Sequence, residues 1–270
     1  MKKRILCLLM ATLMVLSLAA CNKENEAGDN SLKYIKDNGK LVLGLDDSFP
    51  PMGFRDDADN IVGFDIDLAE AVCEKLGVEL VLQPIEWDAK EQELNTKNID
   101  CIWNGMSVTP DRKENMAMSQ TYLLNNISLV VKNDSTIATA ADMAGKKLAT
   151  QSGSSAEETL DYEENKEFKA SLAQINPFSD YVTALMDLET GNSDAVLMDS
   201  IVANYMITEA KKDFKVLDVT FLADEYAIGF RKGELALCNA VNDALSELKK
   251  DGTVEKISVK WFGSDITTIK

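Results

Sequence analysis

The sequence predicts an α/β protein made of two lobes, each with its own sheet. Three observations support this fold class. Short apolar runs typical of buried strands alternate with stretches of helical periodicity. This alternation stops near residue 130 and starts again as a second, smaller unit. The last part of the chain then returns to the pattern of the first unit, so two segments would cross between the lobes. A pair of crossings of this kind is expected to act as a hinge.

The first unit starts with an apolar run over 41–45, interpreted as a buried strand. An amphipathic helix is expected next, because apolar residues occupy positions 64, 68, 69, 72, 73 and 76 before Gly77 ends the pattern. The remaining elements expected here are a strand over 78–83, a helix near 90–96, a strand over 100–103 and an apolar segment over 128–131. Alternating strands and helices favour a parallel sheet.

The second unit is expected to contain a strand over 147–150, helices from 156 and over 181–189, and a strand over 195–198. The chain then returns with a strand over 226–230, a long amphipathic helix over 235–250 and a short helix before Trp261. We therefore assign 32–130 plus 222–270 to lobe one and 131–221 to lobe two.

The N-terminus is typical of a secretory signal peptide over 1–20. Lys2, Lys3 and Arg4 precede an apolar stretch over 5–18, and small residues lead to Cys21. The stretch is shorter than the roughly 20 residues that a membrane-spanning helix needs, which disfavours the alternative of a transmembrane anchor. The ending resembles that of bacterial lipoproteins, which implies cleavage before Cys21 and diacylation of its thiol. Residues 21–31 would then be a lipid-anchored polar tether.

Charge and cysteine content exclude several classes of protein. The formal net charge of -17 would become about -20 after loss of the basic signal peptide, which disfavours nucleic acid as a partner. Cys73, Cys101 and Cys238 lie in apolar patterns without CxxC spacing, so we expect small buried side chains and neither a metal site nor any cofactor.

Three blocks of sequence, in order, resemble the polar amino-acid-binding family of ABC transporter substrate-binding proteins over about residues 40–263. They are GLDDSFPPMGF from Gly44 with VGFDIDLA from Val62, then GMSVTPDR from Gly105 with SQTY from Ser119, and GNSDAVLMD from Gly191; the close is DGTVEKI from Asp251 to KWFG from Lys260. The resemblance implies a class II periplasmic-binding-protein-like fold that captures a free L-amino acid between its lobes. It also implies that the protein works outside the cytoplasm and delivers the amino acid to the permease and ATPase subunits of an ABC importer.

A free amino acid offers a carboxylate and an ammonium, and each needs an opposite charge once water is excluded. Thr109 and Pro110 are typical of a helix start, which would place Arg112 in the first turn, where its guanidinium could hold the carboxylate. Asp199 ends an apolar strand, and the resemblance assigns it to the ammonium. The alternatives are an exposed arginine for Arg112 and a helix N-cap for Asp199.

Other residues of the predicted site come mainly from the resemblance. The turn at Ser152–Ser155 could meet the carboxylate through Ser155, or Ser155 could instead cap the next helix with Glu158. Phe49 and Trp87 could enclose the side chain of the ligand, although Trp87 could equally belong to the core, as we expect of Trp103. The full predicted set is Asp46, Phe49, Trp87, Asn104, Gly105, Met106, Ser107, Thr109, Arg112, Gln151, Ser152, Ser155 and Asp199.

The sequence leaves the ligand open among arginine, lysine, histidine, glutamine and cystine, with a slight preference for a cationic amino acid or cystine. A monomer is the default state. Two other functions are considered: an enzyme like cyclohexadienyl dehydratase, and an amino-acid sensor. The chain has no histidine, so an acid for the enzyme would have to be a residue such as Asp46, Lys90 or Glu91. No catalytic constellation is recognisable, and we expect a binding protein that is not an enzyme.

Overall fold

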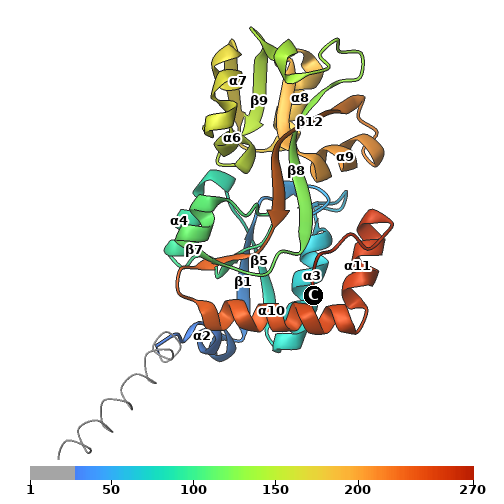
Figure 1. Cartoon of the computed structure of the whole chain (residues 1–270). Helices are drawn as coiled ribbons and strands as arrows, with labels where there is room; N and C mark the ends of the chain where they lie inside the picture. Colours follow the sequence, from blue (N-terminus) through green and yellow to red (C-terminus); the bar gives the residue numbers. More distant parts are fainter. Residues whose placement is uncertain (1–27) are drawn as a thin grey trace, which may run out of the picture.

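The computed structural model describes residues 28–270, which form two α/β lobes joined by two long strands (Figure 1). The predicted signal peptide, Cys21 and most of the tether lie outside the described residues. Within residues 28–270 no helix combines the length and the apolar character needed to cross a membrane. The two-lobed α/β fold class predicted from the sequence is confirmed.

Lobe one contains a five-stranded sheet of mixed direction. Its strands are β1 (Lys40–Leu45), β5 (Glu79–Pro84), β6 (Cys101–Ile102), β7 (Met116–Met118) and β13 (Gly229–Arg231). Strand β1 pairs in parallel with β5 and β6, and β13 pairs antiparallel with β6 and β7. The strand order is β5, β1, β6, β13, β7. The sheet is therefore parallel only in part, because β13 comes from the returning C-terminal segment.

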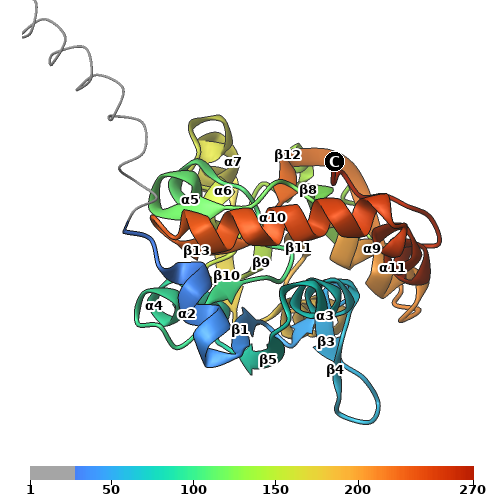
Figure 2. The ribbon, with the colours of Figure 1, turned by 90° about the horizontal axis from the view of Figure 1, so that it is seen from below.

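The helices of lobe one follow the sequence expectations in most places. Helix α3 (Phe64–Leu76) ends where predicted, because Gly77 adopts the left-handed conformation and its N–H bonds to Cys73 and Glu74. The others are α2 (Ser31–Asn38), α4 (Lys90–Asn95), α5 (Pro110–Asn115), α10 (Leu235–Lys250) and α11 (Thr253–Phe262). Figure 2 shows α10 lying across the lobe, where it contacts α2, α3 and α11.

Some elements of lobe one differ from the sequence expectations. A small antiparallel sheet, β2 (Ser48–Phe49), β3 (Gly53–Arg55) and β4 (Ile61–Val62), was not expected, since its strands are too short to show a period. Residue 31 is the last residue of the predicted tether, but in the structure it begins α2. The last helix is predicted to end before Trp261, but α11 extends through Trp261 to Phe262. The cysteines were expected to be buried, and Cys73, Cys101 and Cys238 are buried free thiols.

Lobe two has a second five-stranded sheet with four α-helices. The order is β10 (Gln174–Phe178), β9 (Lys147–Gln151), β11 (Ala195–Asp199), β8 (Leu123–Lys132), β12 (Phe214–Tyr226). Its helices are α6 (Ser155–Thr159), α7 (Lys166–Ser171), α8 (Tyr181–Thr190) and α9 (Ser200–Thr208). Short 3₁₀ turns cover Trp87–Ala89 in lobe one, and Ala140–Met143 and Glu163–Asn165 in lobe two.

Strands β8 and β12 form the connection between the lobes. They pair antiparallel from Leu123 opposite Tyr226 to Lys132 opposite Phe214. Figure 1 shows both strands running between the two lobes. The segment 128–131 was assigned to lobe one from the sequence, but Ser128 pairs with Met198 of β11, within the sheet of lobe two. The lobe limits remain a prediction, and this pairing favours moving the first crossing toward residue 123.

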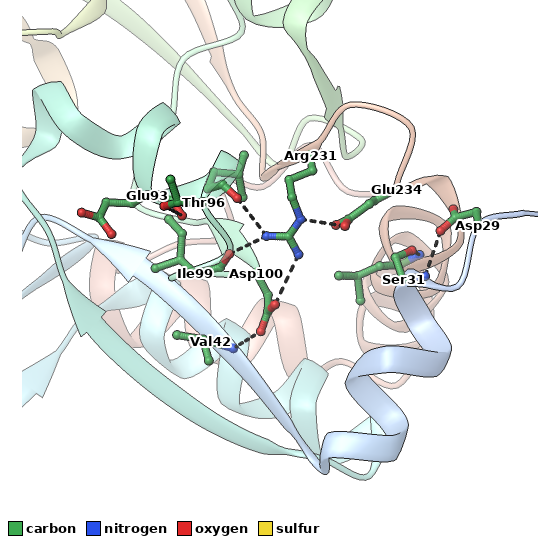
Figure 3. A network of polar contacts seen from close by, with 11 residues as sticks. Asp29, Ser31, Val42, Glu93, Thr96, Ile99, Asp100, Arg231 and Glu234 are labelled. Carbon is green, nitrogen blue, oxygen red and sulfur yellow. Dashed lines mark hydrogen bonds and ion pairs between the residues drawn. The ribbon is translucent and has the colours of Figure 1, made fainter.

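A buried ion-pair network fastens the returning segment to lobe one (Figure 3). The guanidinium of Arg231 donates to Glu234 Oε1 at 2.6 Å, to Asp100 Oδ1 at 3.3 Å, and to the carbonyls of Ile99 at 2.6 Å and Leu94 at 3.0 Å. Asp100 in turn accepts from the amide of Val42 in β1 at 2.9 Å. One arginine thus connects β13 with α4, β6, β1 and the start of α10.

We predict that Arg231→Ala destabilises the protein by about 3–5 kcal/mol, because it removes the cationic partner of buried Asp100 and the side-chain donor to the carbonyl of Ile99. Urea unfolding followed by circular dichroism measures the change. The matched control is Lys33→Ala, which removes the ion pair between two exposed side chains, Lys33 and Asp37. It should change stability by less than about 1 kcal/mol. A loss for Arg231→Ala as small as that of the control would contradict this role.

Candidate functional site

Arg112 is held at the start of α5 as the sequence predicts. Thr109 is the N-cap, and its hydroxyl accepts from the amide of Arg112 at 3.4 Å, while Pro110 takes the first helical position. The side chain is buried, which excludes the alternative of an exposed arginine. Its guanidinium donates to the carbonyl of Ser107 at 3.0 Å and to that of Gly153 in lobe two at 3.4 Å. Within residues 28–270 it forms no ion pair, so a buried cation has only carbonyl partners.

Asp199 lies at the carboxyl end of β11, buried to 3% exposure. It occupies the N-cap position of α9 but makes no capping bond. Instead Oδ1 accepts from Asn125 Nδ2 at 2.7 Å and from the hydroxyl of Tyr226 at 2.6 Å. Burial, and then the nearby carboxylate of Asp224, raise the pKa of Asp199 to about 7. The carboxyl is thus held by neutral donors.

The turn before α6 places a serine hydroxyl in the cleft. Ser154 is the N-cap, accepting from the amide of Glu157 at 3.1 Å, and Glu157 Oε2 accepts from the amide of Gly153 at 2.7 Å. The capping alternative for Ser155 with Glu158 is therefore wrong by one residue. Ser155 is left free, and its hydroxyl lies 2.8 Å from that of Ser107 in lobe one.

These groups surround a small cavity between the lobes. Its lining residues are Phe49, Trp87, Gly105, Ser107, Arg112, Gln151, Ser154, Ser155 and Asp199. Eight of these nine were in the predicted set, and Ser154 was not. Since Arg112, Asp199, Ser107 and Ser155 are each 3% exposed, a molecule can reach them only when the lobes separate.

The other five predicted residues lie around the cavity without lining it. Asn104 Oδ1 accepts from the amide of Asp46 at 3.0 Å, Met106 packs in the apolar cluster beside Trp87, and Thr109 caps α5. Ser152 donates its amide to the carbonyl of Phe178, within lobe two. Asp46 accepts from Gln151 Nε2 of the opposite lobe at 2.7 Å, and burial raises its pKa to about 6. Their assignment to the site remains a prediction.

Two aromatic side chains, Phe49 and Trp87, line the cavity. Phe49 and Trp87 are 5% and 7% exposed, and the ring of Phe49 lies 5.9 Å from that of Tyr181 in lobe two. Trp87 also packs against Leu94 and Ile99, so it combines the cavity and core positions that the sequence left open. Trp103 is fully buried in the core, as expected.

Two residues of the connecting strands, Asn125 and Asp224, belong to the hydrogen-bonded polar groups around the cavity, which we call the polar shell. The sequence analysis did not predict them. Asp224 of β12 accepts from Ser107 Oγ at 2.6 Å and from Asn125 Nδ2 at 3.1 Å. Asn125 of β8 thus donates to both Asp199 and Asp224. Burial raises the pKa of Asp224. No local pattern marks these residues, because β8 and β12 meet only through a pairing of distant segments.

We predict that Asp199→Asn makes the unliganded protein more stable at neutral pH. The folded state keeps the proton of Asp199 up to about pH 7, whereas a free carboxyl titrates near about 3.9, so this group weakens the fold as pH rises between the two values. The variant should melt about 2–4 °C higher than wild type at pH 7.5, with a smaller difference at pH 5. Differential scanning calorimetry of both proteins measures this, with exposed Asp218→Asn as the control. A variant that melts lower at both pH values would refute the prediction.

Comparison of the sequence with known proteins identifies a family and its members. The family model described as "Bacterial extracellular solute-binding proteins, family 3" matches residues 41–264. The L-cystine-binding protein TcyJ of Escherichia coli (strain K12) is 33% identical over 261 residues, which cover 96% of both chains.

Solved structures are similar over most of the chain. An ABC uptake transporter substrate binding protein from Streptococcus pneumoniae, solved with bound histidine, is 41% identical, with a TM-score of 0.85 over 90% of this chain and 99% of the other. The ancestral amino acid-binding protein AncCDT-1, described as a precursor of cyclohexadienyl dehydratase, is 33% identical, with a TM-score of 0.78 over 86% of this chain and 99% of the other. The family resemblance predicted from the sequence is confirmed.

Proposed function

The chain belongs to the bacterial extracellular solute-binding proteins, family 3, and from this premise we propose that it captures a free L-amino acid between its lobes and delivers it to an ABC importer. One observation carries the proposal. Arg112 and Asp199 line the same cavity, are both buried, and pair with uncharged groups alone among residues 28–270. Leaving the buried guanidinium of Arg112 without a counterion is costly, and a zwitterion supplies a carboxylate for Arg112 and an ammonium that favours the ionised form of Asp199.

The serine pair supports a closing motion around the ligand. Ser155 and Ser107 come from opposite lobes and meet at 2.8 Å, and Ser107 continues the chain of hydrogen bonds to Asp224 on the hinge. We infer that the ligand binds first to Arg112 on lobe one, and that lobe two then closes to bring Ser155 and Asp199 against it. Binding shifts the population toward the closed form without any chemical step.

Histidine and cystine are the first ligands to test. Lys90 Nζ lies 5.1 Å from the centroid of the Trp87 ring, so one face of this aromatic already carries a cation. A strongly cationic side chain stacked on the same ring would meet repulsion from Lys90 and Arg112. A neutral or weakly basic side chain avoids this repulsion, which agrees with the histidine and cystine bound by the relatives described above.

An enzymatic role is less well supported. The relatives are described as binding proteins, and the one linked to a dehydratase is itself called an amino acid-binding precursor. Incubation with prephenate, followed by the absorbance of phenylpyruvate, tests this alternative directly. A sensor role uses the same binding step and differs only in the partner that recognises the closed form.

We predict that Arg112→Ala lowers affinity about 100-fold or more for every amino acid, since it removes the charged partner of the α-carboxylate. The experiment is isothermal titration of the domain spanning residues 31–270 with histidine, cystine, arginine and glutamine. Arg55→Ala, which changes a surface arginine paired with Asp47, is the control and should bind as wild type does. Circular dichroism verifies that both variants fold. Affinity retained by Arg112→Ala would overturn the assigned carboxylate site.

We propose further that Cys21 carries the lipid that anchors the protein, as a monomer, to the outer face of the cell membrane. The sequence before Cys21 supports this, and two acyl chains suffice for stable anchoring. Labelling of growing cells with an alkyne palmitate analogue should mark the wild-type protein but not Cys21→Ser. Cys73→Ser, which changes a buried thiol, should remain labelled. Equal labelling of Cys21→Ser and wild type would exclude Cys21 as the modified residue.

A further inference from the structure

Lys90 is a second buried cation at the cleft, outside the predicted site. It is 4% exposed, and every other lysine of residues 28–270 is at least partly exposed. Its ammonium donates to the carbonyl of Trp87 at 3.2 Å and, across the cleft, to the carbonyl of Gly153 at 2.8 Å. It forms no ion pair with a carboxylate in this part of the chain. Burying an ammonium group without a carboxylate partner costs free energy, so this position of Lys90 points to a specific role.

At Gly153, the turn before α6 in lobe two lies close to the backbone of lobe one. Its φ of +69° is in the left-handed region, and a Cβ placed on it would lie 2.7 Å from Asp88 Cα. Only glycine allows both this conformation and this contact. Its carbonyl receives two donors from lobe one, Lys90 at 2.8 Å and Arg112 at 3.4 Å.

We propose that Lys90 is a positioning residue that holds the Gly153 turn in the closed form and frees Arg112 for the ligand. This inference rests on the proposed amino-acid binding. The guanidinium of Arg112 serves the carbonyls of Ser107 and Gly153, and in the complex it must also bind a carboxylate. Lys90 satisfies the Gly153 carbonyl at the shorter distance, so Arg112 can turn toward the ligand without leaving that carbonyl unpaired. The same turn carries Ser154 and Ser155, so fixing Gly153 also places their hydroxyls in the cavity.

The charges around Lys90 agree with this role. Burial, and then the charge of Arg112, lower its pKa to about 8, while Glu91, Glu158 and Asp88 act in the opposite direction. The side chain therefore carries its charge at neutral pH. The bond to Gly153 joins the lobes and exists only when they are closed, so its loss should speed ligand release more than it slows ligand capture.

The test compares wild type with Lys90→Met, which keeps the length of the side chain and removes the donor. We expect the dissociation constant to rise about tenfold for every amino acid that binds, through a faster dissociation rate in stopped-flow measurements. The order of preference among ligands should not change, and the melting temperature without ligand should not fall. Lys75→Met, a surface lysine paired with Asp251, is the matched control. Gly153→Ala should act in the same direction, because its Cβ would separate the lobes.

A structural lysine would behave differently: Lys90→Met would then lower the melting temperature and leave the dissociation rate unchanged, and the proposal would be wrong. A changed order of preference would also overturn it, since Lys90 would then contact the side chain of the ligand. Small-angle X-ray scattering without ligand provides a separate readout. Lys90→Met should lower the fraction of closed molecules that the unliganded protein samples and so increase its radius of gyration, even if wild type binds no amino acid, an outcome that would reject the proposed function alone. An unchanged radius together with unchanged release would reject the role of Lys90.

Discussion

The cleft depends on keeping ionisable groups buried without a hydrogen-bonded counterion. Arg112, Lys90 and Asp199 are nearly inaccessible, yet each is held by carbonyls, an amide or a hydroxyl. Neutral donors and acceptors orient a charge without neutralising it. The rest of the architecture follows from this requirement. The rigid sheets supply strand ends and helix starts where such groups can be fixed, and the hinge allows water to reach them when the cleft opens.

The hinge is therefore part of the polar shell as well as the connection between lobes. Asn125 on β8 and Asp224 on β12 stand opposite each other in the ladder, and Tyr226 ends the second strand. All three bond to Asp199 or to Ser107, so the groups assigned to the ammonium and to lobe closure are held by the strands that would bend. A change of twist in these two strands must shift the donors around Asp199. In the proposed mechanism, these shared hydrogen bonds would couple ligand binding to the geometry of the hinge.

The sequence predicts features with a local cause and fails where the cause is distant. Helices α3 and α10 show a long apolar period, and the helix start that places Arg112 follows from Thr109 and Pro110 alone. The N-cap before α6 was misplaced by one residue, since Ser154 and Ser155 are equivalent locally and only the contact with Ser107 distinguishes them. The sheet membership of β8 depends on pairing with β11 and β12, far along the chain. Lys90 was considered only as a conceivable acid for the enzyme alternative, and its contact with Gly153 could not be predicted because Gly153 lies in the other lobe.

Burial of carboxyl groups in the cleft bears on the charge of the ligand that the cleft can hold. The cleft contains Arg112 and Lys90 together with three buried carboxyl groups, Asp46, Asp199 and Asp224, and burial raises the pKa of each of the three. If all five groups were ionised, the cleft would carry one excess negative charge. A zwitterion leaves the sum over these five groups unchanged, and a raised pKa favours the protonated form of each carboxyl group. A cationic ligand would offset the excess negative charge. The protonation of Asp46, Asp199 and Asp224 therefore affects how strongly the closed cleft favours one charge class of amino acid over another.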